Sequence, residues 1–399
     1  MIKTTPFHDR VSALNETGLW SHWAGHLVVD RYQMSEKFEY FAVRNSAGVF
    51  DTSPLYKYRV YGRDAQRFLA GVLARDVRKC RPGRAQYTIW CDDGGFVLED
   101  GVIFRSSEDE FLLTAAEPNL AYFSDLVGRH SVVIEDVSAQ YAAIAVQGPR
   151  SRTILSGLAP DIADLSYFHF ANTKLGGVPV MVSRTGYTGD LGYEVWVPAG
   201  EALTVWDAVM EAGDGHGMIP FGQIALLMAR IEAGLLLIKV DFESSRYAWN
   251  DHQRSTPLEL GLGWMFRDLA SDDRAFIGRN ALQREIADGT SRWAMEGLLV
   301  DWAEYDRLHR EAGLIAPKDH VPYQFEMMLY DDDGQRAGYA TSFMYSPMLQ
   351  RHIAIARVVP ALSKPGTRVH LEMTINHRYV TVPAYVARTP LYKPDRKTA

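Results

Sequence analysis

A glycine-rich stretch, Ser183–Val195 (SRTGYTGDLGYEV), combines a carboxylate, hydroxyls and aromatic rings at a spacing that folding alone does not require. Its evenly spaced glycines permit positive φ and a close approach of the backbone to a ligand. If Glu194 opens a strand, alternation places it on the same face as Trp196. Because a carboxylate accepts a parallel pair of N–H bonds, this pair predicts a site for a flat, donor-rich heterocycle. A glycine-rich hairpin with an ordinary surface glutamate is the alternative.

A second candidate is a carboxylate on an apolar stripe. Gln86–Arg105 (QYTIWCDDGGFVLEDGVIFR) indicates two strands around DDGG, which is typical of a β-hairpin. Alternation places Asp100 on one face with the apolar residues at 96, 98, 102 and 104, and turns Glu99 outward. A desolvated carboxylate must be paired, hydrogen-bonded or protonated. Asp100 is therefore predicted to act as a general base or as an anion beside a cationic centre; a structural aspartate that closes a turn or pairs with an arginine is the alternative.

An arginine interrupts the most apolar helix that the sequence predicts. Gly222–Ile238 (GQIALLMARIEAGLLLI) is apolar nearly all round, so we expect it to be buried. Arg230 and Glu232 are two residues apart and therefore do not face each other on a helix. Arg230 needs some other anion, which is either a carboxylate elsewhere in the chain or a ligand.

The segment after this helix is polar and aromatic. Lys239–Trp264 has little periodicity, and a long irregular segment between ordered elements is often a functional loop. Within it, His252 is either a proton donor or an ordinary surface histidine.

The other elements frame these residues. Strands are expected on both sides of the glycine-rich stretch and at 141–148, and helices at 64–73, 150–157 and 200–212. From about residue 290 the pattern is all β, which predicts a small antiparallel barrel or sandwich as a separate C-terminal domain. The predicted C-terminal strands are Met295–Val300, Phe325–Tyr330, Gly338–Tyr345, Arg351–Val359, Arg368–Met373 and Val380–Val386.

Composition narrows the class of protein. The 399 residues are 47% hydrophobic, enough for two or three domains with their own cores. A net charge of −7 without a basic run argues against nucleic acid as a partner. No stretch is long and apolar enough for a membrane span and no signal peptide is recognisable, so a cytoplasmic location is expected. Scattered histidines and two unclustered cysteines predict no metal site.

Five motifs in the same order resemble the aminomethyltransferase superfamily, whose namesake is the T-protein of the glycine cleavage system. The resemblance covers nearly the whole chain and includes demethylases that depend on tetrahydrofolate. The motifs are GGFVLEDGV (94–102, family GGxxxDD), SRTGYTGDLGYE (183–194, family RTGYTGEDGYE), ARIEAGLLL (229–237, family RLEAGL), STPLELGLGW (255–264, family TTPxExxLGW) and GYATSFMYSP (338–347, family GxxTSGxxSP).

The resemblance implies an α+β fold of three domains in a cloverleaf, with an antiparallel C-terminal β-barrel and tetrahydrofolate in a central channel. The implied domains are residues 1–54 with 138–270, residues 55–137, and residues 285–392. By resemblance, Glu194 contacts the pterin edge, with Trp196 beside it, and Asp100 lies near the folate nitrogens that accept the carbon. Arg230 and Tyr87 would line the channel, with Tyr187 close by.

Departures from the family pattern fall on the donor side. FDTSPLYK (50–57) replaces the T-protein's FDVSHM, so Pro54 stands in place of histidine and Leu55 in place of methionine. GEDG becomes GDLG, and the segment after the arginine helix is longer. These changes predict a demethylase that moves a methyl from a small methoxy-aromatic, or another O- or S-methyl donor, to N5 of tetrahydrofolate, without a carrier protein.

That reaction needs a proton donor at the departing oxygen. The predicted donors are Tyr187, Tyr247 and His252, while Asp100 offsets the positive charge that develops at N5. Two other functions stay open: an aminomethyltransferase of the glycine-cleavage type, and a folate-binding module without catalysis.

Overall fold

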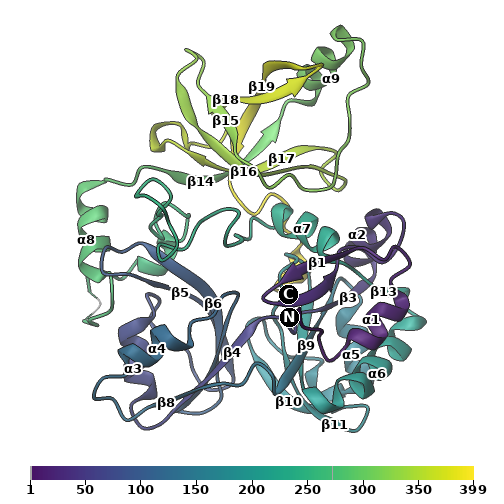
Figure 1. Cartoon of the computed structure of the whole chain (residues 1–399), viewed down its shortest axis with the longest axis vertical. Coiled ribbons are helices and arrows are strands. Elements are labelled where there is room, and N and C mark those ends of the chain that lie inside the picture. The colour runs from purple at the N-terminus through teal and green to yellow at the C-terminus, as the bar shows by residue number, and fades with distance from the viewer. Residues whose placement is uncertain (1, 272) are drawn as a thin grey trace.

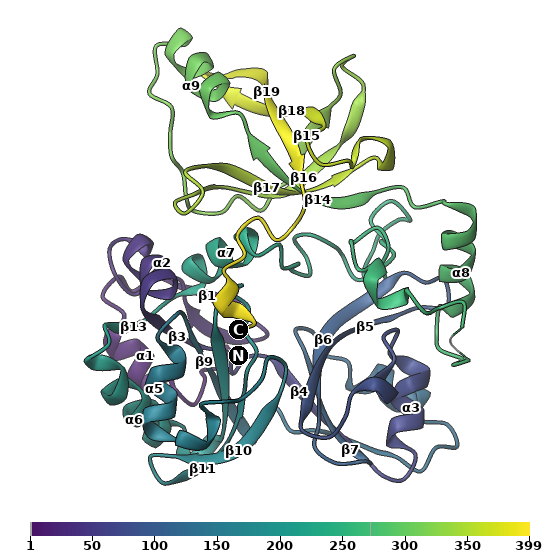
Figure 2. The same cartoon turned by 180° about the vertical axis from the view of Figure 1, so that it is seen from behind.

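The computed structural model describes residues 2–271 and 273–399. Strands in that part of the chain form a six-stranded sheet, a five-stranded sheet, a closed barrel and a two-stranded hairpin, β1 (Trp20–Trp23) with β2 (His26–Val29). The barrel, green to yellow, lies above the two larger sheets, which stand side by side (Figures 1 and 2). This arrangement confirms the predicted α+β fold with a C-terminal antiparallel barrel. The domain boundaries stay a prediction, which the separation of the sheets supports.

Strand β9 (Tyr141–Gln147) lies inside the six-stranded sheet, between β3 (Ala47–Asp51) and β12 (Gly192–Pro198). Its small and β-branched residues fit a strand that is covered on both faces, and residues 142–147 are all buried. The other strands are β10 (Phe170–Leu175), β11 (Val178–Ser183) and β13 (Met218–Pro220). The even-numbered side chains of β9 join the apolar core, so the odd-numbered ones are left for the opposite face.

Helices α1 (His8–Leu14), α5 (Ser151–Leu158) and α6 (Ala202–Asp214) cover one face of this sheet. The apolar cluster that contains Val146 also contains residues that belong to or adjoin these three helices: Phe7, Val11, Leu155 and Trp206. Tyr40 and Val43 of α2 (Glu36–Asn45) pack on the opposite face, in the apolar cluster that contains Phe50 and Ala145. The face with residues 143, 145 and 147 is left for the rest of the molecule.

The five-stranded sheet contains the predicted hairpin of Asp100. Its strands run in the order β5 (Arg84–Cys91), β6 (Val97–Arg105), β7 (Glu110–Ala115), β4 (Tyr56–Tyr61) and β8 (Val133–Asp136). Helices α3 (Ala65–Val72) and α4 (Leu120–Leu126) pack on one face, where Phe68 and Phe123 meet Trp90. On the other face, Phe104 contacts Trp196 of the first sheet with ring centroids 5.5 Å apart. The face of the six-stranded sheet that contains Trp196 is thus turned toward the face of the five-stranded sheet that contains Phe104.

The barrel is the third part of the molecule and lies above the two sheets (Figure 1). Its strands run in the order β14 (Ala294–Val300), β17 (Arg351–Val358), β16 (Arg336–Ser346), β15 (Met327–Tyr330), β18 (Arg368–Ile375) and β19 (Arg378–Ala387). Helix α8 (Arg279–Asp288) precedes the barrel and α9 (Trp302–Glu311) follows its first strand. Every strand that the sequence predicted from residue 295 onward has a counterpart here.

The predicted helix Gly222–Ile238 is too long. Helix α7 (Gln223–Glu232) ends six residues earlier, because Gly234 has a φ of +63° and the chain turns there. The apolar residues 235–238 leave the helix and run beside the two sheets. The run of leucines continues the apolar pattern of the helix, so the sequence predicted a helix that is longer than the observed one.

The last segment of the chain, residues 388–399, returns from the barrel to the six-stranded sheet (Figure 2). There the Arg396 guanidinium donates to both oxygens of the buried Asp190 carboxylate, at 2.6 and 2.9 Å. Asp190 belongs to the glycine-rich stretch, so residues more than 200 positions apart hold this region together.

Candidate functional site

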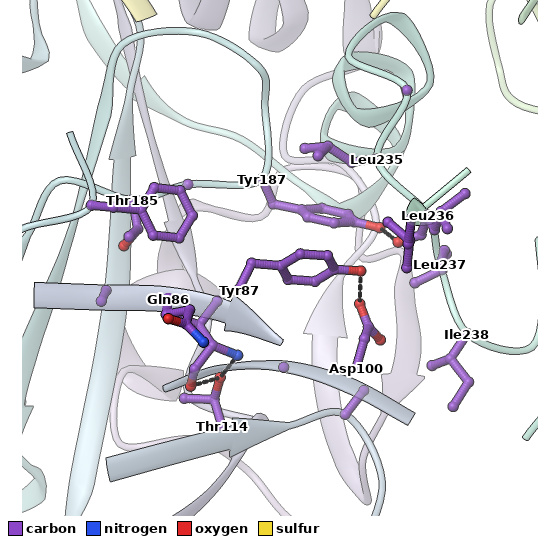
Figure 3. A pocket seen from close by; sticks show the side chains of 18 of the residues that line it. Gln86, Tyr87, Asp100, Thr114, Thr185, Tyr187, Leu235, Leu236, Leu237 and Ile238 are labelled. Carbon is purple, nitrogen blue, oxygen red and sulfur yellow. Dashed lines mark hydrogen bonds between the residues drawn. The ribbon is translucent and has the colours of Figure 1, made fainter. Parts of the chain in front are cut away.

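A cavity of about 1160 Å³ lies where the two sheets, the segment after α7 and the barrel meet. Five of the predicted site residues line it: Tyr87, Asp100, Tyr187, Glu194 and Trp196. Figure 3 shows that the rings of Tyr87 and Tyr187 point in the same direction, toward Asp100 and Leu236. The predicted central channel is therefore present, and it contains the two predicted acids.

Asp100 projects from β6 into this cavity. The Tyr87 hydroxyl, from the neighbouring strand β5, donates to Asp100 Oδ2 at 2.9 Å. Burial raises the pKa of Asp100 to about 6, although the Tyr87 hydrogen bond opposes the shift. Burial together with the Asp100 charge raises the pKa of Tyr87, so its phenol keeps its proton. Asp100 is thus a carboxylate near neutral pH that takes up a proton with little change in conditions.

The prediction that Glu99 faces outward is wrong. Its side chain is 1% exposed and accepts hydrogen bonds from Ala116 N at 2.5 Å, Glu117 N at 2.9 Å and Asn119 Nδ2 at 2.5 Å. Burial, followed by the Asp100 charge, raises the pKa of Glu99 to about 8. The sequence pattern assumed one solvated face, whereas β6 is covered on both.

The apolar stripe is also interrupted. The pairing of β5 with β6 shifts register between Trp90 and Cys91, which is a β-bulge. Leu98 consequently packs with Trp90 beneath the sheet, while Asp100, Val102 and Phe104 line the cavity. Alternation therefore predicts the face correctly only from Asp100 onward.

Glu194 lies across the cavity from this hairpin. In the six-stranded sheet, Phe50 and Glu194 are the two neighbours of Ala145, and all three line the cavity. The methyl group of Ala145 leaves room above the strand for a flat molecule between its two neighbours. Alternation places Trp196 beside Glu194, as predicted.

The Glu194 carboxylate is held by two hydroxyls and keeps capacity for a ligand. Thr185 Oγ1 donates to Glu194 Oε2 at 2.5 Å and lies 2.7 Å from Ser183 Oγ. Burial raises the pKa of Glu194, and hydrogen bonds from Thr185 and Ser183 oppose this shift. A carboxylate accepts about four hydrogen bonds. Oε1 and Oε2 together therefore remain able to accept a parallel pair of hydrogen bonds from a ligand. The Trp196 indole Nε1 has no hydrogen-bond partner among the described residues, so it adds a buried donor to the same wall.

Tyr187 lines the cavity, but its proton is already engaged. Its hydroxyl donates to the backbone oxygen of Leu236, in the segment that leaves α7 early (Figure 3). Burial raises the pKa of Tyr187 well above that of a free phenol. Tyr187 therefore fixes the segment 235–238 against the glycine-rich stretch.

Arg230 does not line the cavity, contrary to the prediction. It is fully buried beside the barrel, where its Nη1 lies 2.5 Å from Asp241 Oδ2 and its Nη2 donates to Ser342 Oγ at 2.8 Å. The internal ion pair is thus the one of the two alternatives that the structure supports. The carboxylate that pairs with Arg230 lies in the irregular segment. No periodicity in that segment indicated which way its side chains point.

Tyr247 and His252 also lie outside the cavity lining. Tyr247 is 47% exposed and lies beside Arg246, whose guanidinium carbon is 5.9 Å from its ring centroid. His252 is exposed, and its backbone N–H donates to the Asn250 side chain at 2.9 Å. The irregular segment turns these side chains to the surface, so the two predicted proton donors do not reach the cavity.

The cavity suits a flat heterocycle with an extended tail. Its volume exceeds the 300–1,000 Å³ typical of ligand pockets, and its walls are mainly apolar and aromatic. A pteridine presents adjacent N–H donors, which match the carboxylate of Glu194. These features fit a reduced folate.

Comparison with known proteins agrees with this geometry. Residues 9–268 match the GCVT N-terminal domain, and residues 312–393 match the glycine cleavage T-protein C-terminal barrel domain. The chain belongs to the glycine cleavage T-protein family. An aminomethyltransferase from Chlorobaculum parvum is 33% identical, with 90% of each chain covered.

Other relatives carry two kinds of name. The aminomethyltransferase of Oceanobacillus iheyensis is 29% identical over 91% of each chain, and a protein from Ectopseudomonas mendocina named heme-dependent oxidative N-demethylase gamma subunit is 31% identical, covering 92% of this chain and 93% of its own. The crystal structure of aminomethyltransferase T from Bartonella henselae has the same fold, with a TM-score of 0.82 at 22% identity over 98% of this chain and 99% of that chain.

Membership of the glycine cleavage T-protein family confirms several predictions. The fold is that of this family, its acceptor cofactor is tetrahydrofolate, and the chain is a one-carbon transferase that depends on folate. Within the described residues, each helix is too short or too polar to pass through a bilayer. The cytoplasmic location and the roles of individual site residues stay predictions.

Sequence reasoning missed Ala145 and Gln147, both of which line the cavity. They occupy alternate positions of the strand at 141–147, so its period-two pattern was the available signal. It was overlooked because neither side chain carries a charge.

Proposed function

We propose that this protein transfers a one-carbon unit from a nitrogen-bound donor to tetrahydrofolate, as an aminomethyltransferase does. The observation that carries the proposal is the Asp100 carboxylate, which lies inside the cavity, accepts a hydrogen bond from Tyr87 and has a pKa of about 6. In an aminomethyl thioether donor the bond between carbon and sulfur breaks, and the sulfur leaves as a thiolate with the bonding electrons. The carbon that remains is electrophilic, and its nitrogen shares the positive charge. An anion beside that centre stabilises the charge.

Transfer from an O-methyl donor makes a different demand. The departing oxygen is basic, so a proton donor must lie beside it. Tyr247 and His252 lie outside the cavity, and the Tyr187 hydroxyl donates its proton to Leu236 O. The cavity thus has an anion where aminomethyl transfer needs one, while the predicted donors for ether cleavage lie elsewhere or are engaged.

Each cavity residue has a part in this proposal. Glu194 accepts hydrogen bonds from the edge of the pteridine and thereby orients it above Ala145. Tetrahydrofolate, when bound, supplies the nucleophilic nitrogen that accepts the carbon. Asp100 stabilises the cationic donor and holds the proton that the reaction releases, and Tyr87 fixes the carboxylate by donating to Oδ2. The apolar wall of residues 235–238 limits the access of water to the electrophile.

Methyl transfer from an O- or S-methyl compound is the second candidate. Thr52 and Leu55, from the segment that departs from the T-protein pattern, both line the cavity. Their positions favour a changed donor pocket. One relative, 31% identical, is named heme-dependent oxidative N-demethylase gamma subunit, so the relatives are not all named aminomethyltransferase.

The test offers tetrahydrofolate and one donor at a time. The donors are an aminomethylated lipoyl carrier protein, the free aminomethylated dihydrolipoyl group, and a methoxybenzoate. The expected product carries the carbon at the methylene oxidation level and forms from an aminomethyl donor, and its dependence on the carrier tests the prediction that none is needed. Methyl transfer from methoxybenzoate alone would favour the second candidate. Tight folate binding without any product would identify a binding module.

A further inference from the structure

Gln147, at the end of β9, has an amide that is fully engaged by the glycine-rich stretch. It is 1% exposed, and its Nε2 donates to the backbone oxygens of Thr185 and Tyr193 at 3.3 and 3.2 Å. Its Oε1 accepts the Thr188 hydroxyl at 2.8 Å. Two carbonyls and one hydroxyl therefore fix which side of the amide is oxygen and which is nitrogen.

Two glycines of the stretch make room for this amide. A Cβ at Gly186 would lie 2.1 Å from Gln147 Oε1, and one at Gly192 would lie 2.2 Å from it. Neither glycine has a positive φ, whereas Gly189 has a φ of +72°. Positive φ, one of the two roles predicted for these glycines, thus holds only for Gly189. Gly186 lines the cavity, and both Gly186 and Gly192 also accommodate a side chain of the protein itself.

The contacts continue from Gln147 to the ligand-facing acid. Gln147 holds the backbone of Thr185, and the Thr185 hydroxyl donates to Glu194 Oε2 at 2.5 Å. In the sheet, Gln147 pairs with Gly192, two residues before Glu194. The amide therefore fixes both the strand that carries Glu194 and the hydroxyl that orients its carboxylate.

We infer that Gln147 is a positioning residue for recognition of the 2-amino-4-oxo edge of the pteridine, acting through Thr185 on Glu194. The inference rests on the proposed function, since it assigns Glu194 to that edge. It goes further by predicting that selectivity between pterins depends on a residue behind the carboxylate. The ligand class that the site selects is a heterocycle with two adjacent N–H donors.

The first experiment measures dissociation constants for tetrahydrofolate and for its 2-desamino-2-methyl analogue, which lacks one of the two donors. The wild-type protein is expected to prefer tetrahydrofolate by at least tenfold. In Gln147→Glu a carboxylate oxygen faces two carbonyl oxygens, and in Gln147→Met the donors are lost. Both variants are expected to reduce the preference to less than threefold.

The control is Gln283→Met. Gln283 is half-buried, its Nε2 donates to the Leu269 backbone oxygen at 3.5 Å, and it lies outside the cavity lining. We expect this variant to keep the preference of the wild-type protein. Thermal unfolding of each variant separates loss of selectivity from loss of folding.

The second experiment is a double-mutant cycle on tetrahydrofolate affinity. Gly192→Ala alone is expected to weaken binding about tenfold, because its Cβ meets Gln147. In a Gln147→Ala background the same change is expected to weaken binding less than threefold, since the obstacle is gone. Gly200→Ala has nothing within 4 Å of its Cβ and serves as the neutral control.

The outcomes separate the two proposals. Unchanged selectivity in folded Gln147→Glu and Gln147→Met, or a strictly additive cycle, would overturn the role of Gln147 and leave the proposed function intact. Failure of the wild-type protein to bind tetrahydrofolate would overturn the proposed function itself.

Discussion

Buried carboxylates lie both in the cavity and at the joint, which is the contact between helix α7 and the barrel. The carboxylates in these two regions accept different numbers of hydrogen bonds. At the joint, Asp241 accepts from Arg230 and Thr341, at 2.5 and 2.6 Å, and also from a backbone N–H and a second hydroxyl. In the cavity, Asp100 accepts from one side chain, Tyr87, and Glu194 accepts from the hydroxyls of Thr185 and Ser183. The saturated acid is part of the architecture, and the acids with remaining capacity face the space for a ligand.

The largest expected effect falls on the cavity side of this comparison. Asp100→Asn is expected to lower kcat/KM about a thousandfold, because it removes the anion beside the reacting centre while keeping the shape. The measurement is product formation from tetrahydrofolate and the best donor. Tetrahydrofolate affinity is expected to change less than fivefold, and a variant with wild-type turnover would remove Asp100 from the chemistry.

Arg230→Met tests the joint. It leaves the Asp241 carboxylate buried without its cation, which is expected to cost about 3–5 kcal/mol of unfolding free energy. Urea unfolding measures the loss. The matched control is Arg10→Met, since Arg10 pairs with Asp207 on the surface at 2.7 Å and solvent-exposed pairs contribute little to stability. Equal losses in the two variants would contradict the distinction between the sites.

The pKa of Asp100 makes stability and activity respond to pH in opposite directions. Its folded-state pKa of about 6 lies above the unfolded value of about 3.9, so its contribution to stability is full below pH 4 and is lost as pH rises through 6. At pH 8, Asp100→Asn is therefore expected to be more stable than the wild-type protein by about 2–3 kcal/mol. Wild-type turnover is expected to rise with pH through about 6. Urea midpoints at pH 4 and 8 that shift together in both proteins would contradict this assignment.

A smaller effect is expected from Thr185→Val. The change removes one of the hydroxyls that donate to Glu194, and is expected to weaken tetrahydrofolate binding about tenfold, or about 1.4 kcal/mol. Thr88→Val is the control, because Thr88 is buried and its Oγ1 has no hydrogen-bond partner among the described residues. Isothermal titration should show a change only for Thr185→Val.

The smallest effects are expected outside the cavity. Tyr247→Phe and His252→Gln are expected to change turnover less than twofold, because both side chains lie at the surface. A tenfold loss in either variant would show that the irregular segment reaches the substrate during the reaction.

The sequence predicted the residues that alternation controls. Strand periodicity placed Asp100 in the cavity and put Glu194 and Trp196 on one face, and the barrel strands followed from their turns. The errors have physical causes that one sequence does not reveal. Glu99 is covered by a loop from elsewhere, and Leu98 lies at a bulge.

Arg230 shows a second limit. Its partner Asp241 is only eleven residues away, but the chain first leaves α7 at Gly234. A buried arginine predicts a nearby anion from charge balance alone, and whether that anion belongs to the protein or to a ligand depends on the path of an irregular segment. Gln147 was missed for a related reason, since its effect depends on glycines that are close in space and distant in sequence.

The return of the last segment to Asp190 affects how the protein is made. Asp190 and Arg396 are 206 residues apart, and a ribosome adds about 5–20 residues per second. Roughly 10–40 s therefore pass between synthesis of the glycine-rich stretch and arrival of the arginine that clamps it. During that interval the nascent chain carries the stretch without this clamp, so the ligand site is completed only after the barrel strands have been synthesised.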